Sequence, residues 1–298
     1  MIEIRSGNGD LNKKKSFITV IIITLIGNLV LAVSKGWIAS VTGSAALYSD
    51  TANSISDVIY SILVAIGLFI AIQPPDRSHP QGHSRFEPLV GMAVTAAMSI
   101  AAYESGRNAI EKIITGPQSI PLSLPVFILV ASALIKALMF FFIQKIGKKH
   151  RSPSLRTIAV DNLTDIFTSV GAFIGILASN WLAPIADPIA GLVVSFWIII
   201  AAFKSGKENL AYLTGATAPA AIKDIIRSSA EEIEGVVEVH HLITEYVGPN
   251  LVVDMHVTVS DQLQFLEAHK INDLITEAVE QIPEVDRAYI HLEPFTDL

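Results

Sequence analysis

Apolar segments of about 20 residues or more, the length that a helix needs to cross a bilayer core, recur through the first two thirds of the chain. These segments contain almost no charge. The chain of 298 residues is 51% hydrophobic and only 16% charged, which is too little charge to cover the surface of a soluble domain of this size. The sequence therefore predicts an integral membrane protein.

The apolar pattern predicts six transmembrane helices, separated by loops that contain glycine or proline. The first segment follows three consecutive lysines and lacks a convincing cleavage site, so we interpret it as a retained span rather than a signal peptide. The six predicted spans cover residues 17–39, 45–72, 88–113, 122–146, 155–179 and 185–203.

The distribution of basic residues predicts the orientation of these spans. Twelve lysines and arginines fall on one side of the predicted layout, whereas the opposite side has only Lys112 and Arg107. The positive-inside rule then places both termini in the cytoplasm. We expect a multi-pass protein of the cell membrane, with the lipid bilayer as its surroundings.

The chain changes character after the sixth span. Residues 218–298 contain four Lys or Arg and sixteen Asp or Glu, which argues against nucleic acid or anionic lipid as a partner. We therefore predict two domains, a membrane domain over residues 1–217 and a cytoplasmic domain over residues 218–298. Cysteine is absent, which excludes disulfides and thiolate metal sites.

Hydrophobic periodicity in the acidic tail predicts a small α+β fold. The order αββαβ suggests an open-faced sandwich with both helices on one side of a sheet, similar to ferredoxin and metallochaperone folds. The predicted helices cover residues 220–233 and 266–282, and the predicted strands cover residues 236–247, 251–259 and 285–292.

Acidic residues within the predicted spans point to function. Asn53 and Asp57 in the second span are four residues apart, as are Asp161 and Asp165 in the fifth, so each pair lies on one helix face. Asp50 precedes the first pair. A charged side chain in the hydrocarbon region costs several kcal/mol on most estimates, so these residues are interpreted as functional. Two such faces turned toward each other would bring four oxygen-bearing side chains together.

A structural role is the alternative interpretation of each single acidic residue. Asp50 could be solvated near the end of its span, and one buried aspartate could pair with Lys35 or Lys136. Two pairs at the same spacing on two helices favour the functional interpretation. Lys136, in the middle of the fourth span, still requires a partner that the sequence does not identify.

Four stretches together resemble the cation diffusion facilitator family. Residues 43–57 look like its second span, residues 161–165 match its fifth span, and residues 187–191 match the start of its sixth span. The loop at residues 76–87 is among the most specific stretches of that family. The resemblance extends over nearly the whole chain, including the αββαβ tail. It implies a homodimeric exporter of divalent metal ions, driven by proton antiport with alternating access, and not an enzyme.

By position, the resemblance implies that the transport site consists of Asn53, Asp57, Asp161 and Asp165. Zinc-transporting members of the family usually have histidine in one or both pairs, whereas all eight histidines here lie outside the spans. Three carboxylates and one amide form an all-oxygen set that suits Mn²⁺ or Mg²⁺ better than Zn²⁺ or Cu²⁺. We therefore expect manganese(II) export, with a zinc(II) or iron(II) exporter of the same family as the alternative. No resident cofactor is expected.

Two further groups of residues match metal sites of the family. Asp76, His79 and His83 match a peripheral site in some members, although a polar loop that anchors helices would explain them equally well. The tail of the family binds metal between two protomers, and surface histidines without a metal are the alternative here. Imidazole favours Zn²⁺, Co²⁺ or Ni²⁺, so the tail is structural or senses a different ion. The tail residues that align with the family ligands are His240, His256, His269, His291 and Glu293.

Other functional classes explain the sequence less well. An intramembrane metalloprotease would require His-Glu-x-x-His in a span, and the motif is absent. A channel would not need a site with four ligands, and a membrane-anchored metal sensor would leave the acidic residues in the spans unexplained. The sequence therefore predicts a metal–proton antiporter.

Overall fold

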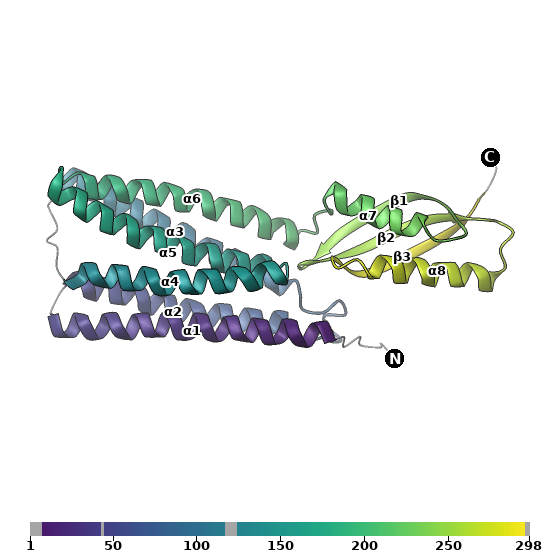
Figure 1. The fold of residues 1–298 in the computed structure, drawn as a ribbon, viewed down its shortest axis with the longest axis horizontal. Helices are drawn as coiled ribbons and strands as arrows, with labels where there is room; N and C mark the ends of the chain where they lie inside the picture. The colour runs from purple at the N-terminus through teal and green to yellow at the C-terminus, as the bar shows by residue number, and fades with distance from the viewer. Residues whose placement is uncertain (1–7, 43–44, 117–123, 296–298) are drawn as a thin grey trace. The chain divides into compact units, whose positions relative to one another are not determined.

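A computed structural model describes residues 8–42, 45–116 and 124–295. Contacts divide the chain into two units, Met1–Asn209 and Leu210–Leu298. The first unit consists of long helices, labelled in Figure 1. The helices are α1 (Asn8–Thr42), α2 (Ala45–Ala71), α3 (Phe86–Thr115), α4 (Leu124–Lys149), α5 (Pro153–Trp181) and α6 (Ala186–Leu213).

The helices agree with the six predicted spans in order and approximate position. Five of them contain a described stretch that is long and apolar enough to cross a membrane, and in α2 the described apolar stretch, Asp57–Ala71, is shorter than that length. The largest difference is at the end of α6, which continues to Leu213, whereas the prediction ended at residue 203. Lys204 and Lys207 end the apolar run but do not interrupt the helix. Hydropathy indicates which part of a helix lies in the bilayer, and it does not indicate where the helix ends.

Apolar residues fill the contacts between these helices. Phe17 of α1, Leu68 of α2, Met98 of α3 and Leu155 of α5 are fully buried in one core cluster. The outward-facing residues are apolar as well, and Phe141 of α4 is one of many large exposed side chains. An apolar exterior of this kind is what a lipid environment requires.

Polar contacts hold α5 against α3 and α6 at one end of the helices. The amide of Asn209 in α6 donates to Thr157 Oγ1 of α5 at 2.8 Å, and Arg156 pairs with Glu208 at 2.8 Å. Asn209 is fully buried and lies directly against Gly91 of α3, where a Cβ atom would overlap its amide. These contacts fix the position of α5, the helix that contains Asp161 and Asp165.

The second unit has the predicted order of helices and strands. Its three strands form one sheet in the order β1-β2-β3, in which β1 and β2 are antiparallel and β2 and β3 are parallel. The elements are α7 (Ala220–Glu231), β1 (Val236–Val247), β2 (Asn250–Val259), α8 (Phe265–Glu280) and β3 (Val285–Pro294).

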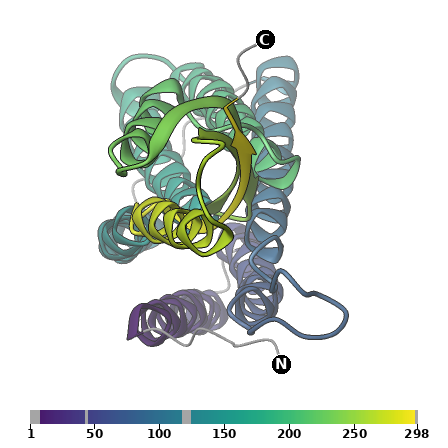
Figure 2. The same cartoon turned by 90° about the vertical axis from the view of Figure 1, so that its right-hand side faces the viewer.

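Alternation along β2 separates the two faces of this sheet. Leu251 and Met255 are fully buried on one face, in a cluster that includes Ile226 of α7 and Ile275 of α8. The opposite face carries His256. Figure 2 shows the strands with both helices beside them. Gly248 begins the two-residue loop between β1 and β2 with φ of 64°, a conformation that glycine adopts readily.

We predict that Gly91→Ala destabilises the helical unit by about 1–3 kcal/mol, because overpacking forces a buried neighbour to shift. The neighbour in question is Asn209. Thermal unfolding of the detergent-solubilised protein would measure the effect. The cost of Gly91→Ala should be smaller when Asn209→Ala is also present, since the overlap is then relieved. An equal cost in both backgrounds would show that the close contact does not limit the packing.

Candidate metal sites

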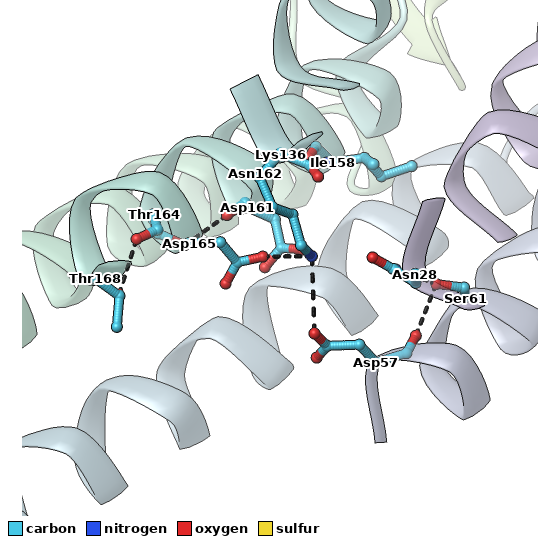
Figure 3. A network of polar contacts seen from close by, with 10 residues as sticks. All are labelled: Asn28, Asp57, Ser61, Lys136, Ile158, Asp161, Asn162, Thr164, Asp165 and Thr168. Atoms are coloured by element: carbon cyan, nitrogen blue, oxygen red, sulfur yellow. Dashed lines mark hydrogen bonds and ion pairs between the residues drawn. The ribbon is translucent and has the colours of Figure 1, made fainter. Parts of the chain in front are cut away.

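Three membrane helices bring opposite charges together in the first unit. The ammonium of Lys136 in α4 lies 2.6 Å from Asp165 Oδ2 of α5 and 3.7 Å from Asp57 Oδ2 of α2. Figure 3 shows this lysine between the two carboxylates. The Lys136 side chain is only 7% exposed, whereas those of Asp57 and Asp165 are 37% and 38% exposed. The carboxylates thus remain partly accessible, whereas the lysine between them is enclosed.

Hydroxyl groups beside the carboxylates donate hydrogen bonds to backbone carbonyls instead of to the acids. Thr164 Oγ1 donates to the carbonyl of Asp161 at 2.7 Å, and Ser61 Oγ donates to the carbonyl of Asp57 at 2.7 Å. Ser61 also accepts from Asn28 Nδ2 of α1 at 2.7 Å, which connects α1 to α2 beside the acid. Such bonds satisfy polar groups inside the membrane and leave the carboxylate oxygens for a cation.

Of the predicted quartet, the structure describes the side chains of the three acidic members. Asp57 and Asp165 meet at one cation, and Asp161 lies beside them in Figure 3. The side chain of Asn53 lies outside the described residues, as does that of Asp50. The proposed role of Asn53 therefore stays a prediction from the sequence.

Lys136 is the residue of this cluster that the sequence singled out but could not pair. A lysine in an apolar span of this kind requires a partner, and two acidic residues on two different helices supply it. The sequence could not select them, because the rotation of α4 relative to α2 and α5 follows from packing across three helices. Lys35, the other lysine considered, is also buried in α1.

The loop between α2 and α3 brings Asp76, His79 and His83 together. One ligand atom from each lies within 4.8 Å of the others. The Asp76 carboxylate accepts from the backbone N–H of His79 at 2.6 Å and from that of Ser78 at 2.8 Å. These hydrogen bonds lower the pKa of Asp76, so the carboxylate stays charged in a position suited to a cation.

The tail unit forms a second cluster on the open face of its sheet. Potential ligand atoms of His240, His256 and Glu293 lie within 4.8 Å of one another. Glu293 Oε1 is 2.8 Å from His256 Nδ1, and Glu293 Oε2 is 3.3 Å from His240 Nε2. A register shift between Val239 and His241 leaves His240 as an extra residue in β1, and such a bulge turns a side chain toward a site.

Two other tail histidines differ in their relation to this cluster. His291 pairs with His256 across β2 and β3, and their ring centroids are 4.9 Å apart. His269 lies on α8, where its ring stacks on Phe265, and its closest described acid is Asp273 at 3.7 Å. Within one chain the structure thus gathers four of the five predicted tail residues and leaves His269 apart. His241, which the prediction did not include, lies beside His256 with a centroid separation of 4.9 Å.

Electrostatics favour cation binding at the tail cluster. The hydrogen bond from His256 lowers the pKa of Glu293, and the nearby His240 and His291 act in the same direction. A charged carboxylate beside several imidazoles can hold a divalent ion of the type that prefers nitrogen ligands.

Comparison with known proteins identifies the family. Residues 21–214 match the cation efflux transmembrane domain, and residues 218–295 match the cation efflux protein cytoplasmic domain. An uncharacterized transporter of Methanocaldococcus jannaschii is 36% identical over 92% of this chain and 96% of its own length. The chain belongs to the cation efflux family of membrane transporters, as the sequence resemblance predicted.

Two relatives in this family are manganese transporters by name. The manganese efflux system protein MneS of Bacillus subtilis is 30% identical over 92% of this chain and 94% of its own length. The manganese efflux system protein MneP of the same organism is 26% identical over 93% of this chain and 95% of its own length. The chain is therefore a multi-pass membrane protein with metal-transporting relatives.

We predict that His256→Ala raises the pKa of Glu293 toward its ordinary value of 4.5, because the hydrogen bond from His256 is the main cause of the lowered pKa. In the unaltered protein, the hydrogen bond between His256 and Glu293 contributes fully to folding stability above pH 4.5, the ordinary pKa of glutamate. This contribution is lost as the pH falls through the lower pKa that Glu293 has in the folded protein. NMR titration of the full-length protein with labelled glutamate, in chelator-treated buffer, would measure the midpoint. His269→Ala is the matched control, because His269 lies outside the cluster, and an unmoved midpoint in His256→Ala would contradict the assignment.

Proposed function

We propose that this protein exports divalent metal ions from the cytoplasm in exchange for protons, and that Mn²⁺ is the transported ion. The observation that carries the proposal is the approach of Asp57 and Asp165, from two membrane helices of a cation efflux protein, to one common cation. An arrangement that holds the charge of a lysine with carboxylates from two helices has the geometry to hold a metal ion. Asp161 and Asn53 complete the proposed transport site.

The chemistry of this set supports manganese. Carboxylate and amide oxygens are hard ligands, which favour Mn²⁺ over Zn²⁺ or Cu²⁺. Among the described residues of the membrane helices there is no histidine that could convert the set into a zinc-type site. The manganese efflux proteins among the relatives support the same ion. Zinc(II) or iron(II) export by the same fold is the alternative that a selectivity measurement decides.

Proton exchange follows from the same acidic side chains. A carboxylate that loses its metal ion in a site of low dielectric favours the protonated form, and an incoming metal ion displaces the proton. Asn53 cannot titrate, so at most the three aspartates of the quartet exchange protons. In this proposal, alternating access exposes the quartet first to the cytoplasm, where metal enters, and then to the opposite side, where protons replace it.

The domains have separate roles in this proposal. Residues 1–217 form the transport domain in the cell membrane, and residues 218–298 form a cytoplasmic domain for dimerisation and metal binding, with both termini in the cytoplasm. The match of the tail to the cytoplasmic domain of the family supports a homodimer. The loop cluster of Asp76, His79 and His83 and the tail cluster of His240, His256 and Glu293 would bind ions outside the membrane.

We predict that Asp57→Ala or Asp161→Ala reduces Mn²⁺ transport to the level of protein-free vesicles, since each removes an oxygen ligand from a site with only four. The measurement is Mn²⁺ uptake into proteoliposomes that contain an internal dye. Asp187→Ala is the matched control, because Asp187 is also a membrane-helix aspartate paired with a lysine, Lys112 at 2.9 Å, but lies outside the quartet. Near-normal flux in either quartet variant, with insertion and dimerisation intact, would refute the site.

We predict that Asn53→His increases Zn²⁺ transport relative to Mn²⁺, because it replaces a neutral oxygen with the imidazole that Zn²⁺ prefers. Asp161→His should act in the same direction. Since histidine titrates near neutral pH, the proton dependence should change with the selectivity. The measurement is the ratio of initial Mn²⁺ and Zn²⁺ rates in the same vesicles at two external pH values. A wild-type preference for Zn²⁺ would exclude the manganese assignment, and an unmoved ratio in both variants would place selectivity outside the quartet.

A further inference from the structure

The ammonium of Lys136 lies in the region that a metal ion shared by Asp57 and Asp165 would occupy. It is 2.6 Å from one carboxylate and 3.7 Å from the other. A divalent ion bound to the same oxygens would lie roughly 2.0–2.6 Å from each. The lysine and the ion therefore use the same oxygens at closely similar positions (Figure 3).

We infer that Lys136 is an affinity-setting residue of the transport site, whose positive charge competes with the transported ion for Asp57 and Asp165. This inference rests on the proposed function of these carboxylates in transport. It adds a role for a residue that is not itself a metal ligand. Lys136 acts on the ion through the two aspartates, so it is a positioning residue and not a ligand.

Competition follows from charge and from burial. Two cations that approach the same carboxylate oxygens repel each other, and the repulsion is stronger inside the protein than in water because the dielectric constant is lower. Lys136 is largely enclosed, at 7% exposure, so solvent screens its charge poorly. An incoming ion must either displace the ammonium from Asp165 and Asp57 or bind against its repulsion, and both routes weaken metal binding.

Weaker binding is useful in a transporter. An ion must bind firmly enough to enter a site and weakly enough to leave it. Three carboxylates without a competing charge would favour capture over release. A lysine has a compact charge on a flexible stem of four carbons, so it can move aside when the ion binds and return when the ion leaves.

The other described lysine–aspartate pair between membrane helices provides a contrast. Lys112 of α3 contacts Asp187 of α6 at 2.9 Å, but its side chain is 54% exposed and Asp187 does not belong to the quartet. Solvent screens that pair, and its aspartate does not bind the transported ion in our proposal. Lys112→Met therefore removes the same charge and contact without affecting the site.

The test compares Lys136→Met, Lys136→Arg and Lys112→Met with the wild type in the full-length protein. Mn²⁺ binding is measured from the electron paramagnetic resonance signal of the free ion. Asp57→Ala lacks a ligand of the proposed transport site, so the binding that remains in this variant measures the metal bound elsewhere in the protein. We expect Lys136→Met to lower the Kd for Mn²⁺ by about tenfold or more, given the coupling energies measured for close charge pairs. Its maximum transport rate should fall because release is slower. Lys136→Arg should keep the weak binding, and Lys112→Met should resemble the wild type.

A role of Lys136 in folding alone predicts different results. If Lys136→Met is folded but its Kd is unchanged or higher, the competition is refuted. If Lys136→Met folds only when purified with Mn²⁺, the competition is supported, because the ion then replaces the lysine charge. A variant that stays unfolded with Mn²⁺ present would refute it. The proposed function is tested separately, because it fails if the wild type does not transport Mn²⁺. If the wild type transports Mn²⁺ but Lys136→Met binds it with an unaltered Kd, only the role of the lysine is overturned.

Discussion

The contact of Lys136 with Asp57 and Asp165 is the interaction on which the membrane unit depends. Charges in the hydrocarbon region are costly, and aspartates on facing helices would repel one another without a cation between them. The ammonium, 2.6 Å from Asp165 and 3.7 Å from Asp57, makes it favourable for α2, α4 and α5 to face one another. Removing one partner from a buried arrangement of this kind leaves a charge uncompensated. The three helices are therefore coupled through their charges as well as through packing.

The remaining helices support this arrangement through polar contacts. Ser195 Oγ of α6 donates to the carbonyl of Ala102 in α3 at 2.7 Å, and the amide of Asn209 donates to Thr157 of α5 at 2.8 Å. Hydrogen bonds between membrane helices add specificity where apolar packing alone would not distinguish protein from lipid. In this way α3 and α6 hold α5, the helix that contains Asp161 and Asp165. Carboxylates thus meet on the membrane helices, whereas imidazoles cluster with carboxylates in the loop and the tail.

Much of the fold could be predicted from the sequence, because the bilayer and the sheet impose simple periodicities. The order of helices and strands follows from the length of apolar runs and from alternation. The end of α6 at Leu213 was missed, since helices continue beyond the apolar region. The partner of Lys136 and the separation of His269 from the tail cluster depend on how helices rotate and pack, which a single sequence does not encode locally.

The distribution of charges over different helices has a mechanical consequence. The ammonium of Lys136 is on α4, whereas the aspartates that it contacts are on α2 and α5. Any rigid-body shift of α4 relative to α2 and α5 changes the distances between the lysine and the carboxylates, and electrostatic energy in a site of low dielectric depends steeply on distance. A conformation that brings the ammonium closer would weaken metal binding, and one that withdraws it would strengthen binding. If the protein works by alternating access, as we propose, rigid-body shifts of this kind would change the affinity of the proposed site without changing its ligands.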